Sequence, residues 1–157
     1  MNNVEPISVI ERHGNKTPVP IYEIIFEMGV EFAFQAMPDN VSGWIERLPS
    51  GKYKIAVNSN HPSTRQRFTA AHELGHYIYH RDLLGDGVGD NRAYRPDGTD
   101  RPNANILPRH ERQANSFAAN VLMPRQVIAA IPGPQNVSML AELFEVSQET
   151  MRIHLGE

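Results

Sequence analysis

The first clear pattern in the chain is a helical stripe of apolar residues. The stretch "IYEIIFEM" carries them at positions i, i+3, i+4 and i+7, namely Ile21, Ile24, Ile25 and Met28. This spacing is typical of one face of an amphipathic helix. Pro20 stands where a first helical turn tolerates proline, and Gly29 stands where a helix commonly ends. The pattern therefore predicts a helix over residues 21–28.

The residues that follow change to the pattern of strands. "VEFAF" at 30–34 is alternating or continuously apolar, as in a half-buried or buried strand. "VSGWIERL" at 41–48 and "YKIAVN" at 53–58 have the same character, and a Pro-Ser-Gly turn separates them. Two such runs around a short turn predict a hairpin. We therefore expect a helix followed by about three strands.

A second helix has a recognisable start. Ser63 is a good N-cap and Gln66 follows three residues later, which is the pattern of a capping box and predicts a helix from about Thr64 to His80. The next segment, 81–108, is crowded with Gly, Pro, Asp and Asn and predicts a long loop with at most one short strand. Loops of this length often serve as lids or binding segments.

Helical periodicity returns in the last third of the chain. "HERQANSFAANVLM" at 110–123 is helical and Pro124 stops it. "VSMLAELFEVSQETMRIHLG" at 137–156 predicts two short helices that meet at Val146, with Ser147 capping the second. Together the elements predict an α+β fold in which a small antiparallel sheet packs on a helical core. We expect a core over 1–124 and a helical tail over 125–157 that is packed on the core or continuous with it.

Composition narrows the class of protein. With 157 residues, 40% of them apolar and 21% charged, the chain suits one globular domain rather than a disordered segment. No apolar run approaches the ~20 residues that cross a bilayer, and the first residues are too polar for a secretory signal. The absence of cysteine excludes disulfides and thiolate ligands and fits a reducing compartment. We therefore expect a cytoplasmic protein with no membrane partner.

The main chemical motif is His-Glu-x-x-His in the helix predicted over 64–80. Residues four apart share one helix face, so His72 and His76 can present two imidazole nitrogens to one metal ion. A catalytic zinc site needs three protein ligands and keeps one position open for water. Because the chain has no cysteine, the third ligand is either His80 or a carboxylate from another helix.

Between these two candidates the geometry of a helix favours the carboxylate. His80 lies one turn beyond His76, and a rise of about 6 Å per four residues carries it away from a common tetrahedral ion. We therefore interpret His80 as a packing residue or as a support for a ligand. Glu111 opens a helix whose apolar face suits packing against the helix of the histidines. The alternative role for Glu111 is a first-turn carboxylate that complements the helix dipole.

Two blocks of the sequence resemble a known family. "RQRFTAAHELGHYIYH", followed at a distance by "ERQANSFAANVLMP", is similar to the ImmA/IrrE metallopeptidases, which are gluzincin-like intracellular enzymes often encoded beside a helix-turn-helix repressor. The resemblance spans about 41–124. It implies that His72, His76 and Glu111 bind zinc and that Glu73 is the catalytic carboxylate. We expect one zinc ion per chain, with manganese as a possible substitute in vitro.

The chemistry of such a site follows from its ligands. Two neutral imidazoles and one carboxylate leave a zinc site with a net charge of about +1, so that a bound water loses a proton near neutral pH. Glu73 can take this proton and deliver it to the leaving amine. A further donor should stabilise the tetrahedral oxyanion. The candidates are Tyr94, His110 and Arg109, with Tyr94 as the working candidate.

The substrate site is less visible in the sequence. Zincins commonly hold a peptide as an added strand at a sheet edge, and the strand at 41–48 or the strand at 53–58 could be that edge. Trp44 either lines a pocket there or belongs to the core.

Three functions remain at this stage. The first is a zinc endopeptidase that cleaves a specific cytoplasmic protein. The favoured substrate is a helix-turn-helix repressor encoded nearby. The second is a metal-binding sensor or toxin-like partner of a DNA-binding antitoxin or repressor, with little or no proteolysis. The third, a DNA-binding regulator that uses the tail, is disfavoured. The whole chain has a net charge of −3, and residues 138–157 hold four Glu and one Arg, which would repel DNA phosphates.

Overall fold

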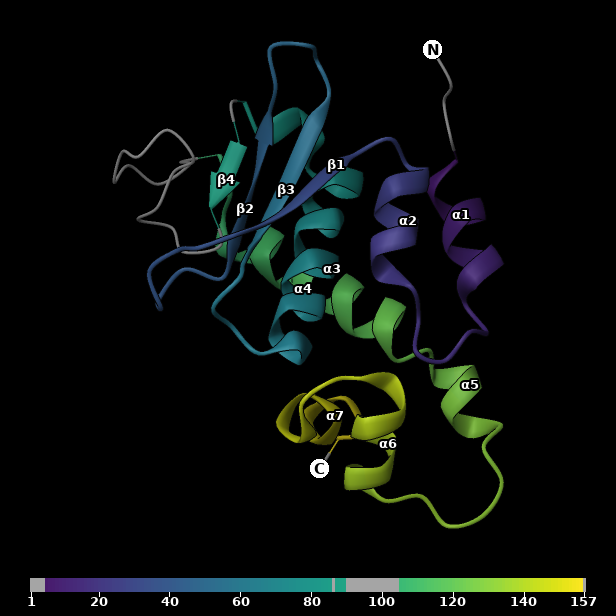
Figure 1. The fold of residues 1–157 in the computed structure, drawn as a ribbon. Coiled ribbons are helices and arrows are strands. Elements are labelled where there is room, and N and C mark those ends of the chain that lie inside the picture. The colour runs from purple at the N-terminus through teal and green to yellow at the C-terminus, as the bar shows by residue number, and fades with distance from the viewer. Residues whose placement is uncertain (1–4, 86, 90–104, 157) are drawn as a thin grey trace.

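The computed structural model describes residues 5–85, 87–89 and 105–156, and it shows an α+β fold in which helices cover one small sheet. The sheet has the strand order β1-β3-β2-β4. The helices α2 and α3 contact it, and the tail helices lie below the crossing of α3 and α4 (Figure 1). The α+β class predicted from the sequence is confirmed.

The predicted hairpin forms the middle of the sheet. β2 (Gly43–Arg47) runs antiparallel to β3 (Tyr53–Asn58), with Ile45 opposite Ile55. β1 (Glu31–Gln35) pairs with the other side of β3, and it is parallel to it. The sheet is therefore mixed and not purely antiparallel. The chain reverses between β1 and β2, and β3 then returns between them, so that β3 runs in the direction of β1.

The prediction that the segment 41–48 or the segment 53–58 provides an open sheet edge is wrong. β3 is paired on both sides. β2 is paired with β3 and with β4 (Gly87–Gly89), a short strand of the kind that the loop prediction allowed. The outer strands of the described sheet are therefore β1 and β4. Trp44 is only 4% exposed and packs in a small cluster with Met37, Val41 and Ala56, which confirms its interpretation as a core residue.

The helix of the metal motif begins differently from the prediction. α3 spans Ser63–Tyr79, and Pro62 occupies the N-cap without a side-chain hydrogen bond. The capping box predicted at Ser63 and Gln66 is absent, because Gln66 Nε2 instead donates to the Asn58 carbonyl at 2.9 Å. Ser63 thus lies inside the first turn of α3. A short 3-10 helix, η1 (Arg81–Leu83), follows α3.

The remaining helices include two that the sequence pattern did not indicate. α2 (Ile21–Glu27), α4 (Pro108–Leu122), α6 (Val137–Phe144) and α7 (Gln148–His154) lie where the periodicity placed them. α1 (Pro6–His13) and α5 (Arg125–Ala129) are additional. Ser147 accepts a hydrogen bond from the Thr150 amide and caps α7, as predicted. No helix in the described part of the chain has the length and apolar character needed to cross a bilayer.

The tail packs on the same hydrophobic core as the sheet. Leu140, Phe144 and Met151 belong to one buried cluster with Ile45 and Leu74. Polar contacts fasten the tail as well. Arg67 of α3 lies 3.6 Å from Glu145, measured from Nε to Oε2, and it donates from Nη2 to the Val19 carbonyl at 2.8 Å.

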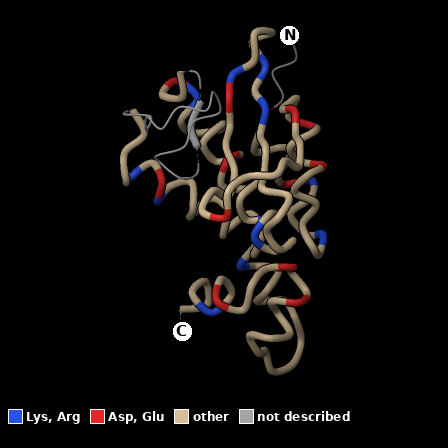
Figure 2. Tube along the Cα trace, turned by 60° about the vertical axis from the view of Figure 1, so that its left-hand side comes forward, with Lys and Arg blue, Asp and Glu red and all other residues tan. Residues whose placement is uncertain are grey.

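A second polar fastening joins the end of the tail to the end of α4. His154 donates from Nε2 to the Met123 carbonyl at 2.8 Å, and Arg125 donates from Nη1 to the His154 carbonyl at 3.1 Å. Among the described residues of the tail, Glu142, Glu145 and Glu149 stand against Arg125 and Arg152, so acidic side chains outnumber basic ones there (Figure 2).

The His154 contact gives the tail a pH-dependent stability. Burial lowers the pKa of His154 below its ordinary value of about 6.5, the hydrogen bond to Met123 opposes this, and Arg125 lowers the pKa further. The unfolded chain therefore binds the proton more readily than the folded chain. The contribution of the neutral ring to stability is complete above about pH 6.5 and is lost as the pH falls towards the lowered pKa.

We expect His154→Gln to flatten this dependence. Glutamine keeps a donor for the Met123 carbonyl but does not titrate. Between about pH 7 and pH 5 the free energy of unfolding of the wild type should fall more steeply than that of the variant. Denaturant unfolding at several pH values measures both. Parallel pH profiles for the two proteins would contradict the prediction.

Candidate metal centre

Three predicted ligands meet where α3 and α4 cross. His72 and His76 project from one face of α3, and Glu111 projects from the first turn of α4. One ligand atom from each lies within 4.8 Å of the other two. Glu111 Oε1 is 2.7 Å from His76 Nε2 and 3.8 Å from His72 Nε2. The structure thus brings together residues that are far apart in the sequence and that were predicted to share one ion.

The donor set fits a catalytic metal ion. Two imidazole nitrogens and one carboxylate oxygen are the ligands of many hydrolytic zinc sites, and three protein ligands leave a coordination position for water. Both histidines are buried, with 4% of His72 and 1% of His76 exposed, while Glu111 is partly open. Burial on one side and access on the other is what a reactive metal site requires.

An amide of α4 orients His72. The Oδ1 atom of Asn115 is 2.7 Å from His72 Nδ1. A carbonyl oxygen only accepts, so His72 Nδ1 carries the proton and donates it, which leaves the lone pair on Nε2. Such a partner fixes the ring and its tautomer for metal binding. Sequence reasoning missed Asn115, although its position four residues after Glu111 places both on one face of α4.

His80 does not join the ligand cluster found among the described residues. Its Nδ1 atom lies 2.9 Å from His76 Nδ1, and its Nε2 atom lies 2.7 Å from Gln113 Oε1. Burial lowers the pKa of His80, and the hydrogen bond to Gln113 opposes this shift only in part. The neutral ring therefore contacts His76 on the side away from the metal-binding nitrogen, as a support for a ligand would.

Glu73 is the residue predicted to be the catalytic carboxylate. It follows His72 directly in α3, and none of its surface is exposed. One residue along a helix rotates the side chain by about 100°, which directs it beside the two histidines rather than onto their common line.

The predicted oxyanion donors have different positions. Tyr94 lies outside the described residues. Arg109 is exposed at the start of α4. His110 accepts a hydrogen bond from the Leu107 amide at Nδ1, at 2.9 Å, so that this nitrogen caps the helix, and its ring centroid lies 4.9 Å from that of His80. Desolvation, and then the charge of Arg109, lower the pKa of His110, which favours a neutral ring.

A glycine between the two histidines lets the helices come close. A Cβ atom at Gly75 would lie 3.0 Å from Phe117 Cδ1 and 3.2 Å from Ala114 Cα. Only a residue without a side chain allows the backbone of α4 to approach α3 this closely. The approach brings the first turn of α4, and with it Glu111, within reach of the histidines. A glycine inside a helical pattern is the sequence signal for such packing.

We expect Gly75→Ala to destabilise the protein and to weaken metal binding. Alanine should gain up to about 1 kcal/mol in helix propensity. Overpacking against Ala114 and Phe117 should cost about 1–3 kcal/mol and shift α4. Denaturant unfolding and metal titration measure both effects. Gly14→Ala is the matched control, because a Cβ atom there would meet only carbonyl oxygens, at 3.4 Å and beyond. A stabilised Gly75→Ala protein would contradict the close packing.

This arrangement defines a class of protein. A helix that carries His-Glu-x-x-His, with a carboxylate from the next long helix beside it, is the pattern of a metal-dependent peptidase. The family model described as the IrrE N-terminal-like domain, Peptidase_M78, matches residues 30–155. The chain therefore belongs to this peptidase family, and the resemblance of its two sequence blocks is confirmed.

A solved structure shares the fold. A Mycobacterium tuberculosis transcriptional regulator superposes with a TM-score of 0.61 and 19% sequence identity, over 96% of this chain and 45% of that chain. At this identity the likeness concerns the fold alone. The chain spans less than half the length of that regulator. No curated protein matches the sequence.

Proposed function

We propose that the chain is a zinc-dependent endopeptidase that cleaves a specific cytoplasmic protein, a helix-turn-helix transcriptional repressor encoded nearby. One observation carries the proposal. The ligand atoms of His72, His76 and Glu111 converge within 4.8 Å in a member of a peptidase family. Zinc is favoured because nitrogen ligands and one carboxylate suit it better than magnesium or calcium, which prefer oxygen ligands.

The residues of the chain have separate tasks in this reaction. A zinc ion held by the three ligands would supply a Lewis acid for the scissile carbonyl and would acidify the attacking water. Asn115 keeps His72 in the tautomer whose Nε2 can bind. Glu73 accepts a proton from the water and passes it to the leaving amine. Water adds to the carbonyl carbon and the C–N bond breaks, which yields one carboxylate and one amine.

The sheet offers a place for the peptide. An extended peptide binds to a sheet edge through main-chain hydrogen bonds. Of the two outer strands of the described sheet, β4 comes from the segment between α3 and α4, the two helices that carry the ligands. We therefore assign the peptide to the β4 edge.

A repressor is the proposed target for two reasons. The family resemblance implies neighbouring repressor genes, and the solved structure of similar fold is that of a transcriptional regulator. The acidic tail of this chain makes its own binding to DNA a poor alternative, and a protein partner remains.

The test combines the purified full chain, zinc or manganese, and the product of an adjacent repressor-like reading frame. Mass spectrometry should find one defined cut that depends on the metal and is absent in the presence of a chelator. A complex that forms without any cut would replace proteolysis by sequestration, in which the chain acts as a metal-binding sensor or a toxin-like partner.

A further inference from the structure

Gln113, His80 and His76 form a continuous hydrogen-bonded chain that ends at the metal centre. Gln113 Oε1 lies 2.7 Å from His80 Nε2, and His80 Nδ1 lies 2.9 Å from His76 Nδ1. On its other side, His76 Nε2 lies 2.7 Å from Glu111 Oε1. His80 is 3% exposed, so water has little access to the central link of this chain.

Metal binding by His76 determines which ring nitrogen carries the proton in both His76 and His80. A neutral imidazole carries one proton, and a ligand nitrogen must offer its lone pair. If His76 binds through Nε2, its proton is on Nδ1 and is donated to His80 Nδ1. His80 then carries its own proton on Nε2 and donates it to Gln113. The last acceptor must be an oxygen, and the Oε1 atom of Gln113 provides it.

If the donors and acceptors of this hydrogen-bonded series were reversed, His76 could not bind a metal ion through Nε2. If the amide nitrogen of Gln113 faced His80, it would donate to Nε2, and His80 would donate from Nδ1 to His76. The proton of His76 would then be on Nε2, the atom that a metal ion needs. The two directions therefore correspond to a binding tautomer and a non-binding tautomer of His76.

We propose that Gln113 and His80 are positioning residues that hold His76 in the metal-binding tautomer, so that zinc affinity depends on a hydrogen-bond acceptor at position 113. The proposal rests on the metal centre of the proposed function and adds two residues to it. α4 thus acts on both histidines, directly on His72 through Asn115 and indirectly on His76 through Gln113 and His80.

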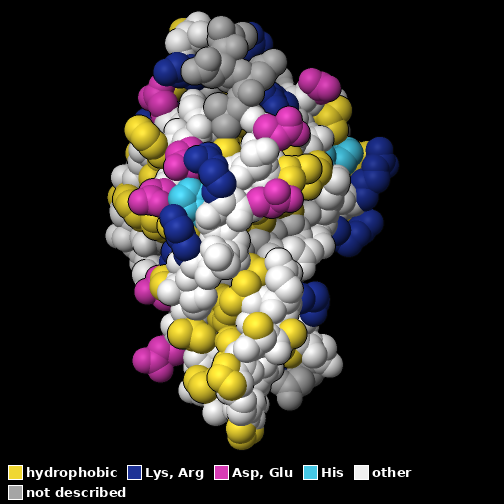
Figure 3. Space-filling view, turned by 90° about the vertical axis from the view of Figure 1, so that its right-hand side faces the viewer, with side chains coloured by type: hydrophobic (Ala, Val, Ile, Leu, Met, Phe, Trp, Pro, Cys, Tyr) yellow, Lys and Arg dark blue, Asp and Glu magenta, His cyan; other side chains and the backbone are white. Residues whose placement is uncertain are grey.

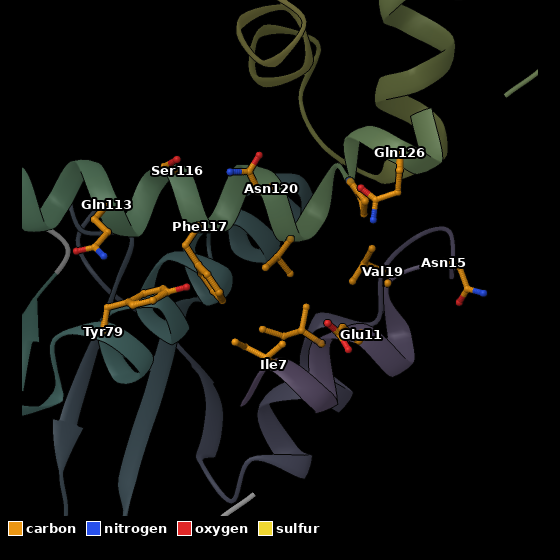
Figure 4. Close-up of a pocket in the computed structure, with 14 residues that line it drawn as sticks. Ile7, Glu11, Asn15, Val19, Tyr79, Gln113, Ser116, Phe117, Asn120 and Gln126 are labelled. Atoms are coloured by element: carbon orange, nitrogen blue, oxygen red, sulfur yellow. The ribbon is translucent and has the colours of Figure 1, made fainter. Parts of the chain in front are cut away.

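The outer end of this hydrogen-bonded series, the side chain of Gln113, is open to solvent. Gln113 is exposed and lines a groove of about 680 Å³ between α1, α4 and the end of α3, beside Tyr79 (Figure 4). Figure 3 shows the side of the molecule that carries α1 and α5, where hydrophobic side chains gather towards the lower end of the view. A substitution at position 113 therefore changes the last acceptor without opening a cavity in the core.

Zinc affinity of the full chain, measured by competition with a chelator, tests the proposal. Gln113→Leu has similar size but no acceptor, and it should lower zinc affinity by about 10-fold or more, the usual effect of losing a partner of a ligand. Gln113→Glu keeps an acceptor in place and should retain the affinity. Asn120→Leu, in the same helix and groove, is the matched control and should bind zinc as the wild type does.

A double-mutant cycle separates this role from simple packing. His80→Phe keeps a ring in the core but removes both nitrogens, and it should weaken zinc binding to a similar extent. In that background Gln113→Leu should have no further effect, because its only route to His76 is gone. NMR of the zinc-loaded protein should find the imidazole proton on Nδ1 of His76 and on Nε2 of His80.

Three results would overturn the proposal, namely wild-type zinc affinity in Gln113→Leu, an undiminished effect of that change in the His80→Phe background, or the opposite tautomers. Each of these leaves the metal centre itself intact. A wild-type chain that binds no zinc would overturn the proposed function as well, so the two failures are distinguishable.

Discussion

Glu73→Gln should abolish most of the peptidase activity while leaving the metal in place. Glutamine preserves the size of this fully buried side chain and much of its hydrogen bonding, but it cannot accept a proton from water. Loss of a general base typically costs 10²-fold or more in rate, so we expect cleavage of the partner protein to fall by about 10² or more. Metal content and partner binding should stay close to those of the wild type.

Three measurements on the same preparations make this result decisive. They are the zinc content, the binding of the partner and the amount of cut peptide. Glu142→Gln, an exposed change of the same kind in the tail, should behave as the wild type does. Loss of zinc together with activity would show that Glu73 holds the site together. Equal cleavage by wild type and Glu73→Gln would contradict the assignment of Glu73 as the base.

Glu111→Ala should lower metal affinity by orders of magnitude. The change removes the only carboxylate of the three-residue cluster and leaves two neutral imidazoles, which cannot hold a metal ion strongly. His72→Ala and His76→Ala should have effects of similar size. Titration of the metal-free protein with zinc measures all three, since reconstitution excludes loss during purification.

The matched comparison is with His80→Phe. This change removes a support of one ligand rather than a ligand, so its effect should be near 10-fold and well below that of Glu111→Ala. A larger loss of metal affinity in His80→Phe than in Glu111→Ala would indicate that His80, and not Glu111, is the third ligand. Equal, small effects of the Glu111 and His80 changes would remove Glu111 from the site.

The parts of this site that the sequence predicts are those set by a single helix. The spacing of His72 and His76 places both on one face wherever that helix packs. Glu111 was harder to predict, because a first-turn glutamate is common. Helix geometry favoured a carboxylate over His80, and the family resemblance then implied Glu111 as the ligand. The structure adds the missing information, which is that α4 packs against α3 beside the two histidines and brings Glu111 to them.

Other features could not be predicted because they depend on contacts distant in the sequence. The parallel position of β1 results from the insertion of β3 between β1 and β2. The Gln66 side chain could form a capping box at the start of α3 or donate to the Asn58 carbonyl. It donates to Asn58, which lies close only in the folded protein. Gln113 and Asn115 are uncharged amides among many, and no local pattern shows that histidines lie opposite them.

The contact at Gly75 also has a mechanical consequence. Where the backbones of two helices pack directly against each other, few rotatable side-chain atoms lie between them. The distance between the two helices therefore changes little under an applied force. The distance between the histidines and Glu111 is then determined by the direct contact of the α3 and α4 backbones and not by flexible side chains between them. Less conformational freedom remains to be lost when a ligand arrives, so much of the entropic cost of assembling the site is met when the chain folds.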